Sequence, residues 1–280
     1  MLDVAILGAG ELGGSIAHVL AQRDIARTIR LIDEHGQIAA GKALDIMQSA
    51  PVERFDTIVI GATDRFVAAS AAIVVIADRA NGGEWTGEEG LMLLRHIGHL
   101  GRGRLVICAG AAQRELVEAG VREAGFAASH LIGTAPDALV ASAKAIVAVE
   151  VDASVREVGL TVLGVPPNQL VIPWDDATIG GRAATRLLTE PVRRRIDARI
   201  HATWPPGPHA LALAAADAIA GSVDRTRRTF SCFVAADADA THREHTVARP
   251  VRLSTRGAER VELPMLTGHA RAMFENALLK

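Results

Sequence analysis

Short apolar runs alternate with helix-compatible segments along the first half of the chain, and this alternation constrains the fold more than any other feature. Five runs are nearly continuous in Val, Ile and Leu and predict strands, at Val4–Leu7, Thr28–Asp33, Thr57–Ile60, Ile73–Ala77 and Leu105–Ala109. Strands without polar alternation are typical of a parallel sheet covered on both faces. Helical segments lie between them, at Leu12–Gln22, Gln37–Ser49, Glu88–Leu100 and Gln113–Glu123. The order predicts an α/β fold with a doubly wound parallel sheet.

The pattern changes after about Gly133. Helices are predicted at Pro136–Val149, Pro191–His201, His209–Gly221 and Leu266–Leu279. An extended stretch is predicted at Glu157–Leu163, and alternating strands at Thr229–Ala235, Thr246–Leu253 and Arg260–Leu263. Because 280 residues suit about two domains, we expect a first domain over residues 1–137 and a second, α+β domain over residues 138–280.

The amino-acid composition limits the classes of binding partner and the cellular compartment that can be expected. The chain has 30 basic and 32 acidic side chains, and it has no tyrosine. We therefore expect neither a nucleic acid nor a membrane partner. No apolar run approaches the roughly 18 residues of a membrane helix, and the N-terminus does not resemble a signal peptide, so a cytoplasmic location is predicted. Cys108 and Cys232 are predicted to be buried, reduced thiols.

A glycine-rich turn follows the first predicted strand and opens the first helix, with the sequence Gly8-Ala9-Gly10-Glu11-Leu12-Gly13. In a dinucleotide-binding turn of this kind, the first glycine permits the tight turn, the second admits a pyrophosphate and the third lets helix and strand pack closely. The start of the helix, at Glu11 and Leu12, offers free amides to the phosphates. Asp33 ends the second strand, where a carboxylate accepts ribose hydroxyls and repels a 2′-phosphate. The pattern predicts a Rossmann fold that binds NAD in preference to NADP; a structural turn without ligand is the alternative.

Longer stretches of the sequence are similar to one family. The segment Gly41–Pro51 (GKALDIMQSAP), together with Gly8–Gly14 and Leu31–Glu34, resembles the NAD-dependent lactate/malate dehydrogenases, and divergent malate dehydrogenase-like features continue thinly along the whole chain. The chain is shorter than is usual in the family, mainly between Gly181 and Thr203. The resemblance implies a Rossmann domain, NAD as cofactor and a small-molecule ligand. It also implies a homo-oligomer, since family members associate as dimers or tetramers.

The resemblance also implies a set of catalytic positions, and this sequence departs from each position that we can align. The family uses an Asp–His pair as proton donor and an arginine that grips the substrate carboxylate. The family's aspartate, arginine and histidine correspond to Leu139, Ser142 and Pro166. Its two loop arginines and its asparagine correspond to Gly82, Glu88 and Ala109. No catalytic residue is therefore predicted from the family.

Other residues were considered as substitutes. His209, Thr203 and Arg79 lie in segments that border the family's active site, and each is more often a structural or solvated side chain. The family's turn over the cofactor reads Ile76-Ala77-Asp78, so Ala77 is a predicted cofactor contact and Asp78 places a negative charge near the pyrophosphate. The spacing His242-x-x-His245 lacks a third ligand, so no metal site is predicted.

Three functions remain open from the sequence. The first is a silent or strongly divergent family member that binds NAD and acts as a regulator, sensor or subunit. The second is a working NAD-dependent oxidoreductase on malate, lactate or an uncharged carbonyl, with a proton supplied by His209, Thr203 or water. The third is a structural or interaction subunit that binds no nucleotide.

Overall fold

The first half of the chain forms a parallel sheet with helices on both faces. The computed structural model describes residues 2–101, 103–224, 228–236 and 245–279. Six parallel strands lie in the order β3-β2-β1-β4-β7-β8. They are β1 (Leu2–Leu7), β2 (Ala26–Ile32), β3 (Ile58–Ala62), β4 (Ile73–Ile76), β7 (Leu105–Cys108) and β8 (Leu131–Gly133). The first strand is central and the crossovers run to both sides, which is the Rossmann order and confirms the predicted fold class.

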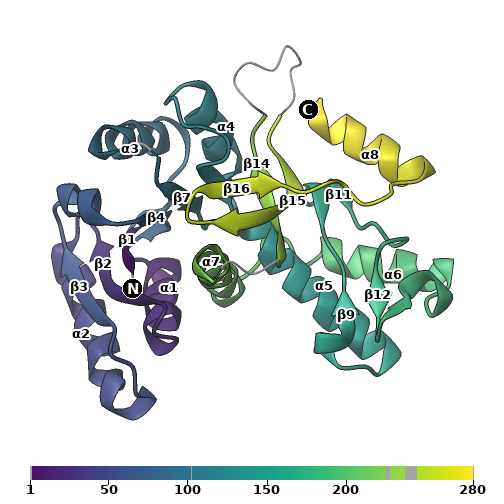
Figure 1. Cartoon of the computed structure of the whole chain (residues 1–280), viewed down its shortest axis with the longest axis horizontal. Helices are drawn as coiled ribbons and strands as arrows, with labels where there is room; N and C mark the ends of the chain where they lie inside the picture. Colours follow the sequence, from purple (N-terminus) through teal and green to yellow (C-terminus); the bar gives the residue numbers. More distant parts are fainter. Residues whose placement is uncertain (1, 102, 225–227, 237–244, 280) are drawn as a thin grey trace.

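Four α-helices and one 3-10 helix connect these strands (Figure 1). They are α1 (Glu11–Gln22), α2 (Gly36–Glu53), η1 (Arg65–Ser70), α3 (Gly87–Leu100) and α4 (Arg114–Arg122). A short hairpin of β5 (Asp78–Arg79) and β6 (Gly83–Glu84) lies between β4 and α3. The sequence predicted the four α-helices and five of the six parallel strands to within a few residues, because the apolar periodicity is strong in each segment. It did not predict β8 or the hairpin of β5 and β6.

The sheet continues without a break into the second half of the chain. Strand β8 pairs with β14 (Thr229–Val234), which pairs with β15 (Val247–Ser254), and both pairings are antiparallel. Strands β10 (Leu163–Val165), β11 (Gln169–Val171) and β16 (Gly257–Arg260) complete an 11-stranded sheet. A small second sheet contains β9 (Val158–Gly159), β12 (Thr178–Ile179) and β13 (Arg182–Ala183). The helices of this half are α5 (Ala135–Val151), α6 (Glu190–His201), α7 (Pro208–Val223) and α8 (Gly268–Leu278), and the 3-10 turns are η2 (Val155–Glu157) and η3 (Ala184–Arg186).

Two strand predictions were wrong in the second half. The extended stretch expected at Glu157–Leu163 is split between β9 and β10, which belong to different sheets. The strand expected at Arg260–Leu263 lies earlier, at β16, because a tight turn at Thr255 and Arg256 pairs Gly257 directly with Ser254. The Ser254 hydroxyl oxygen accepts a hydrogen bond from the Arg256 amide at 3.2 Å, which stabilises this turn.

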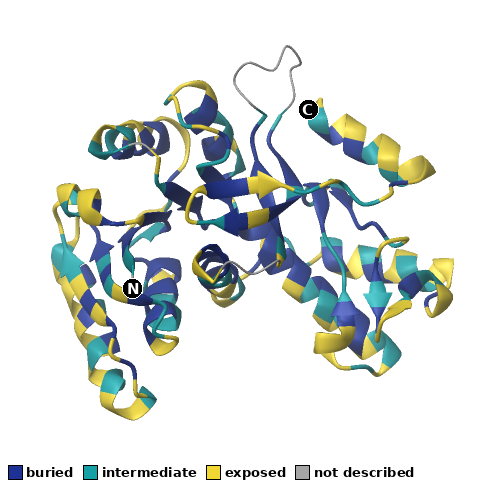
Figure 2. Ribbon diagram, viewed as in Figure 1, coloured by how far each residue is buried: buried dark blue, intermediate teal, exposed yellow. Residues whose placement is uncertain are grey.

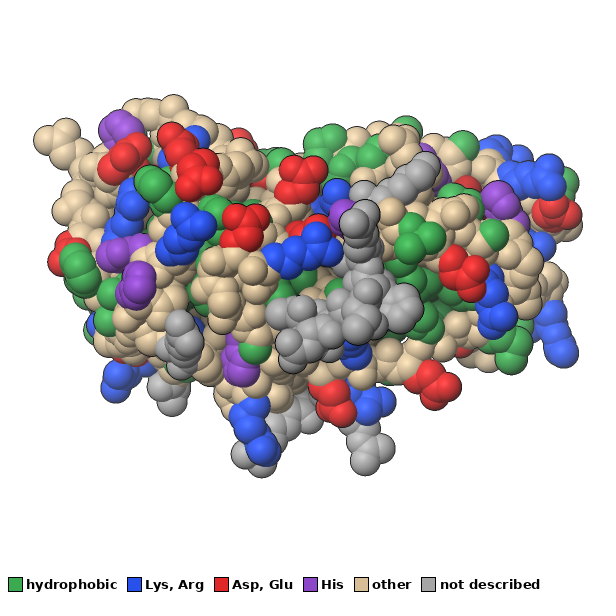
Figure 3. Space-filling model, turned by 90° about the horizontal axis from the view of Figure 1, so that it is seen from above, with side chains coloured by type: hydrophobic (Ala, Val, Ile, Leu, Met, Phe, Trp, Pro, Cys, Tyr) green, Lys and Arg blue, Asp and Glu red, His purple; other side chains and the backbone are tan. Residues whose placement is uncertain are grey.

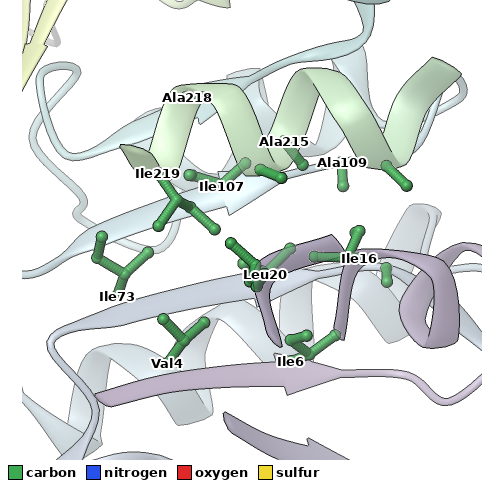
Figure 4. Packing of buried hydrophobic residues seen from close by; sticks show 14 of the residues in the cluster. Val4, Ile6, Ile16, Leu20, Ile73, Ile107, Ala109, Ala215, Ala218 and Ile219 are labelled. Carbon is green, nitrogen blue, oxygen red and sulfur yellow. The ribbon is translucent and has the colours of Figure 1, made fainter. Parts of the chain in front are cut away.

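The two halves share one hydrophobic core. Helix α7 comes from the second half of the sequence, yet it packs beside α1 against the parallel strands (Figure 4). Ala215 and Ala218 are small side chains on the buried face of α7, so this helix can lie close to Ile16 and Leu20 of α1. Figure 2 shows that the central strands, such as β4, β7 and β8, are buried while the helices are exposed on their outer sides.

The distribution of charge on the surface and the burial of the two cysteines were both expected from the composition. Acidic and basic side chains are interspersed on the face shown in Figure 3. Within the described ranges, no helix is both long and apolar enough to cross a membrane. Cys108 and Cys232 are both buried and unbonded to one another, and burial raises the pKa of both thiols.

The shared core gives a test of the fold. Leu20 of α1 is fully buried between α7 and the sheet, whereas Leu213 of α7 is 44% exposed. Leu20→Ala should lower the free energy of unfolding by about 2–5 kcal/mol, because it leaves a cavity. Leu213→Ala makes the same chemical change and should cost less than about 1 kcal/mol. Urea denaturation of both variants measures the difference; equal losses would contradict the packing of α7 on α1.

Candidate functional site

The predicted cofactor residues lie together at the switch point of the sheet. Strands β1 and β4 are neighbours, and the chain leaves their carboxyl ends in opposite directions, which is where ligands bind in open α/β sheets. The turn of Gly8 to Gly13 follows β1 and leads into α1, Asp33 follows β2, and Ala77 follows β4. The structure thus brings Gly8, Gly10, Glu11, Leu12, Gly13, Asp33 and Ala77 to one edge of the sheet. Their predicted role as cofactor contacts stays a prediction.

The glycines of this turn pack against the chain itself. A Cβ atom at Gly8, whose φ is +117°, would lie 2.3 Å from the carbonyl oxygen of Asp78. A Cβ atom at Gly10 would lie 2.3 Å from the carboxyl carbon of Asp78, and one at Gly13 would lie 2.0 Å from the carbonyl oxygen of Gly8. All three glycines are therefore required by internal packing, so the motif alone is not evidence for a ligand.

The carboxylate of Asp78 lies on the amides that open α1. Its Oδ1 accepts a hydrogen bond from the Gly13 amide at 2.9 Å, and its Oδ2 accepts one from the Leu12 amide at 3.2 Å. The backbone oxygen of Asp78 also accepts a hydrogen bond from the Gly10 amide at 2.9 Å. Gly10 has no side chain to cap the helix, so Asp78 performs that role from a distant part of the sequence. A carboxylate is stabilised there by the positive end of the helix, which is also where phosphates bind.

Asp33 is enclosed by backbone amides. Its Oδ2 accepts hydrogen bonds from the amides of Ala9 at 2.8 Å and Ala80 at 2.9 Å, and its Oδ1 accepts one from the His35 amide at 2.9 Å. The side chain is only 1% exposed. Burial alone would raise the pKa of Asp33, but the hydrogen bonds from these amides hold it below its usual value. The carboxylate is therefore charged. Three backbone amides donate to it, and His35 Nδ1 lies 3.3 Å from its Oδ1.

Glu84 makes a third contact of the same kind. Its carboxylate accepts hydrogen bonds from the amides of Ala111 at 3.0 Å and Ala112 at 2.8 Å, which follow β7. Burial raises the pKa of Glu84, the two amide bonds oppose that rise, and the nearby charge of Asp78 adds to it. We call residues 78–84 the cradle hairpin, because both of its ends bind amides at the carboxyl edge of the sheet.

The residues at this edge do not fit a bound dinucleotide in the arrangement described. A dinucleotide needs free amides at the start of α1 for its pyrophosphate and a free carboxylate after β2 for its ribose. Asp78 uses the first and the Ala80 amide covers the second. Sequence reasoning placed Asp78 near the phosphates but missed Glu84 and the Ala80 amide, because their partners lie far away in the chain. It also missed Lys42, whose Nζ donates to the Gly10 carbonyl oxygen at 2.5 Å.

The positions aligned with the family's substrate machinery are apolar or locally bonded. Leu139 is fully buried in a cluster that includes Val162 and Ile200. The Ser142 hydroxyl donates to the Ala138 carbonyl of its own helix at 3.3 Å. Pro166 lies between β10 and β11 and is joined to Pro167 by a cis peptide bond.

The three substitute residues lie on separate elements. The Arg79 guanidinium donates to Glu89 at 2.7 Å and to the Gly82 carbonyl at 2.8 Å, and it stacks over the ring of Trp85. The Thr203 hydroxyl donates to the Ile200 carbonyl at 2.7 Å. His209 is exposed at the second residue of α7.

A metal site is not formed by the described residues: they contain no group of three or more His, Cys, Asp or Glu side chains that could hold an ion. His245 lies with its Nδ1 2.9 Å from Oε1 of Glu118. His242, the other member of the spacing noted in the sequence, lies outside the described residues.

Asp137 is the aspartate closest to the family's catalytic position, and it faces elsewhere. Its Oδ1 accepts a hydrogen bond from the Ser231 amide of β14 at 3.1 Å, and its Oδ2 lies 3.8 Å from the Arg228 guanidinium. Burial raises its pKa to about 6, although the Ser231 bond and Arg228 oppose the rise. Asp137 therefore joins α5 to β14 and is not a replacement for the family's aspartate.

Comparisons with known proteins agree with the fold. The strand order and the glycine turn at the switch point define a protein of the Rossmann fold class. A family profile described as lactate/malate dehydrogenase, NAD binding domain, matches residues 2–87. A malate dehydrogenase of Chlorobium phaeobacteroides is 26% identical over 99% of this chain and 96% of its own length. A malate dehydrogenase of Thioalkalivibrio sulfidiphilus is 43% identical over 76 residues, which are 27% of this chain and 25% of that protein.

Solved structures show the same architecture. The malate dehydrogenase of Salinibacter ruber superposes with a TM-score of 0.88 at 21% identity, covering 99% of this chain and 94% of that one. The malate dehydrogenase of Plasmodium falciparum in complex with NADH gives 0.84 at 17% identity, covering 99% and 95%. The chain thus resembles the lactate/malate dehydrogenases, through the NAD-binding domain profile over residues 2–87 and through full-length similarity to malate dehydrogenases at 23–27% identity.

The buried carboxyl of Asp137 makes a prediction about pH. Its pKa is about 6 in the folded protein, against an ordinary value of 3.8, so the folded state takes up this proton first as pH falls. Relative to Asp137→Asn, which cannot titrate, the wild type should therefore gain up to about 3 kcal/mol of stability between pH 7.5 and pH 4. Urea denaturation of both proteins across this range measures the gain. A constant difference would show that the folded protein does not raise this pKa.

Proposed function

We propose that this chain is a catalytically silent member of the lactate/malate dehydrogenase family that acts as a binding or structural subunit. The observation that carries the proposal is the setting of Leu139, which holds the position aligned with the family's catalytic aspartate. This side chain is fully buried among other apolar groups, so the site beside α5 has no group there to orient or charge a proton donor.

The remaining positions support the same conclusion. Loss of a general acid costs about 10²–10⁴-fold in rate, and Pro166, aligned with the family's histidine, cannot transfer a proton. Loss of the carboxylate-binding arginine removes the anchor that aligns a keto acid, and Ser142 is bonded to its own helix. Glu88, aligned with a loop arginine, is exposed and paired with Arg95 at 3.5 Å, so this position offers no positive charge to an anionic substrate.

A working oxidoreductase is not favoured by the substitute residues. Arg79 is paired with Glu89 of α3, Thr203 is bonded to the end of its preceding helix, and His209 is exposed on α7. The resemblance to the family and the glycine turn are the reasons to consider NAD as a ligand. NAD could bind this chain only after the Asp78 carboxylate leaves the amides of α1. The proposed role therefore does not depend on hydride transfer.

Turnover tests this proposal. The purified chain should not accelerate NADH oxidation by oxaloacetate, pyruvate or an uncharged ketone above the rate without protein, because no proton donor or carboxylate clamp is in place. The measurement is loss of NADH absorbance, with an active malate dehydrogenase as the positive control. Saturable turnover of oxaloacetate by this chain would refute the silent assignment.

We further propose that the chain forms a homo-oligomer and that its domains are residues 1–137 and 138–280. The boundary falls in the first turn of α5, shortly after β8, where the pairing of the sheet changes from parallel to antiparallel. Support for association comes from the family and from exposed apolar side chains on α2, where Leu44 is 59% and Val52 is 83% exposed.

Light scattering tests the oligomer. The chain has a mass of 29.4 kDa, so a dimer or tetramer should elute with two or four times that mass. Val52→Asp should lower the mass if α2 lies in the interface, because a charge buried there would be unpaired. A monomer of wild-type protein at micromolar concentration would contradict the proposal.

A further inference from the structure

We propose that the cradle hairpin, residues 78–84, occupies the place where a Rossmann fold binds a dinucleotide, at the start of α1 and beside Asp33. In that position it excludes a dinucleotide. The inference goes beyond the silent assignment, because it concerns binding and not turnover. It depends on three carboxylates, Asp78, Glu84 and Asp33, each of which bonds to two or more backbone amides at the same edge of the sheet.

Asp78 takes the place of the pyrophosphate. Its carboxylate accepts hydrogen bonds from Leu12 and Gly13, and its backbone oxygen accepts one from Gly10, so all three contacts fall on the turn and helix start that a dinucleotide would use. The absence of a side chain at Gly10 leaves room for this carboxylate, since a Cβ there would overlap it. A pyrophosphate that entered beside Asp78 would meet a like charge, so the two cannot share the amides.

The middle of the hairpin closes the ribose position. The Ala80 amide donates to Oδ2 of Asp33, and the same oxygen accepts from the Ala9 amide. A ribose hydroxyl would have to displace one of these donors, and the displaced amide would lose its partner in a buried place. The carboxylate that the sequence assigned to the ribose therefore holds the hairpin instead.

The hairpin is also fixed on its outer side. Arg79 bonds to Glu89 of α3 and to the Gly82 carbonyl, and its guanidinium stacks on Trp85, which is itself buried. Glu84 anchors the second strand of the hairpin to the amides of Ala111 and Ala112. An anion tethered in this way competes at an effective concentration on the order of millimolar, which lowers the apparent affinity of the amides for a free dinucleotide.

A binding titration with NADH tests the inference on the whole chain. The wild type should show no saturable change in NADH fluorescence up to millimolar concentration. Asp78→Ala should bind NADH at least tenfold more tightly, because it removes the competing charge and frees the amides of α1. Asp78→Asn keeps an oxygen acceptor for the helix and should give a smaller gain, so it serves if the alanine variant does not fold. Glu115→Gln, which removes an exposed carboxylate on α4, is the matched control and should bind no better than wild type.

The outcomes separate this inference from the proposed function. Micromolar binding of NADH by the wild type would overturn the inference, with the silent assignment untouched if no substrate is turned over. Equal binding by wild type and both Asp78 variants, with native thermal melts, would overturn it as well. Tight binding by Asp78→Ala without turnover would support both proposals, whereas binding with turnover of oxaloacetate would support this one and refute the silent assignment.

Discussion

The bond between the Asp78 carboxylate and the amides that open α1 determines what the nucleotide side of this protein can do. A helix start at the centre of a doubly wound sheet attracts an anion, whatever molecule carries it. In this chain the anion is covalently part of the loop after β4. The same loop then reaches Asp33 through Ala80 and the amides after β7 through Glu84. One contact thus places a whole hairpin over the edge where a cofactor would lie.

The fold could be predicted from the sequence because it depends on local patterns. Continuous apolar strands, regular helices and a glycine turn at the first crossover are sufficient for the parallel sheet and its order. The strand boundaries failed where pairing and not periodicity sets them, as at Gly257, which begins β16 because it pairs with Ser254. The packing of α7 on α1 could not be predicted, since it joins segments that lie nearly two hundred residues apart.

The sequence indicated where the candidate site lies, but not whether its amides and carboxylate oxygens are free to bind a ligand. Gly8, Gly10, Gly13 and Asp33 lie at one edge, because the ends of neighbouring parallel strands meet there. Whether their amides and oxygens are free depends on tertiary hydrogen bonds. The Asp78 bond to Gly13 spans 65 residues and the Ala80 bond to Asp33 spans 47, and neither leaves a local signature. A glycine motif therefore shows that backbone must come close to something, and here the chain supplies its own carboxylate.

The positions aligned with the family's substrate site are governed by the cost of burying polar groups. A reactive chamber needs buried polar groups that are held in place by partners, and such groups are costly to bury without them. In this chain, Leu139 joins a hydrophobic cluster instead, and Asp137 is used to join α5 to β14. These two positions therefore serve the packing of the second half of the protein and not a reaction.

Amide hydrogen exchange of the ligand-free protein tests the central claim most directly. If Asp78 holds the start of α1, the Leu12 and Gly13 amides should exchange slowly without any ligand, and added NAD at millimolar concentration should leave their rates unchanged. Fast exchange of these two amides in the free protein, followed by protection when NAD is added, would show that the cradle is open and that the account is wrong.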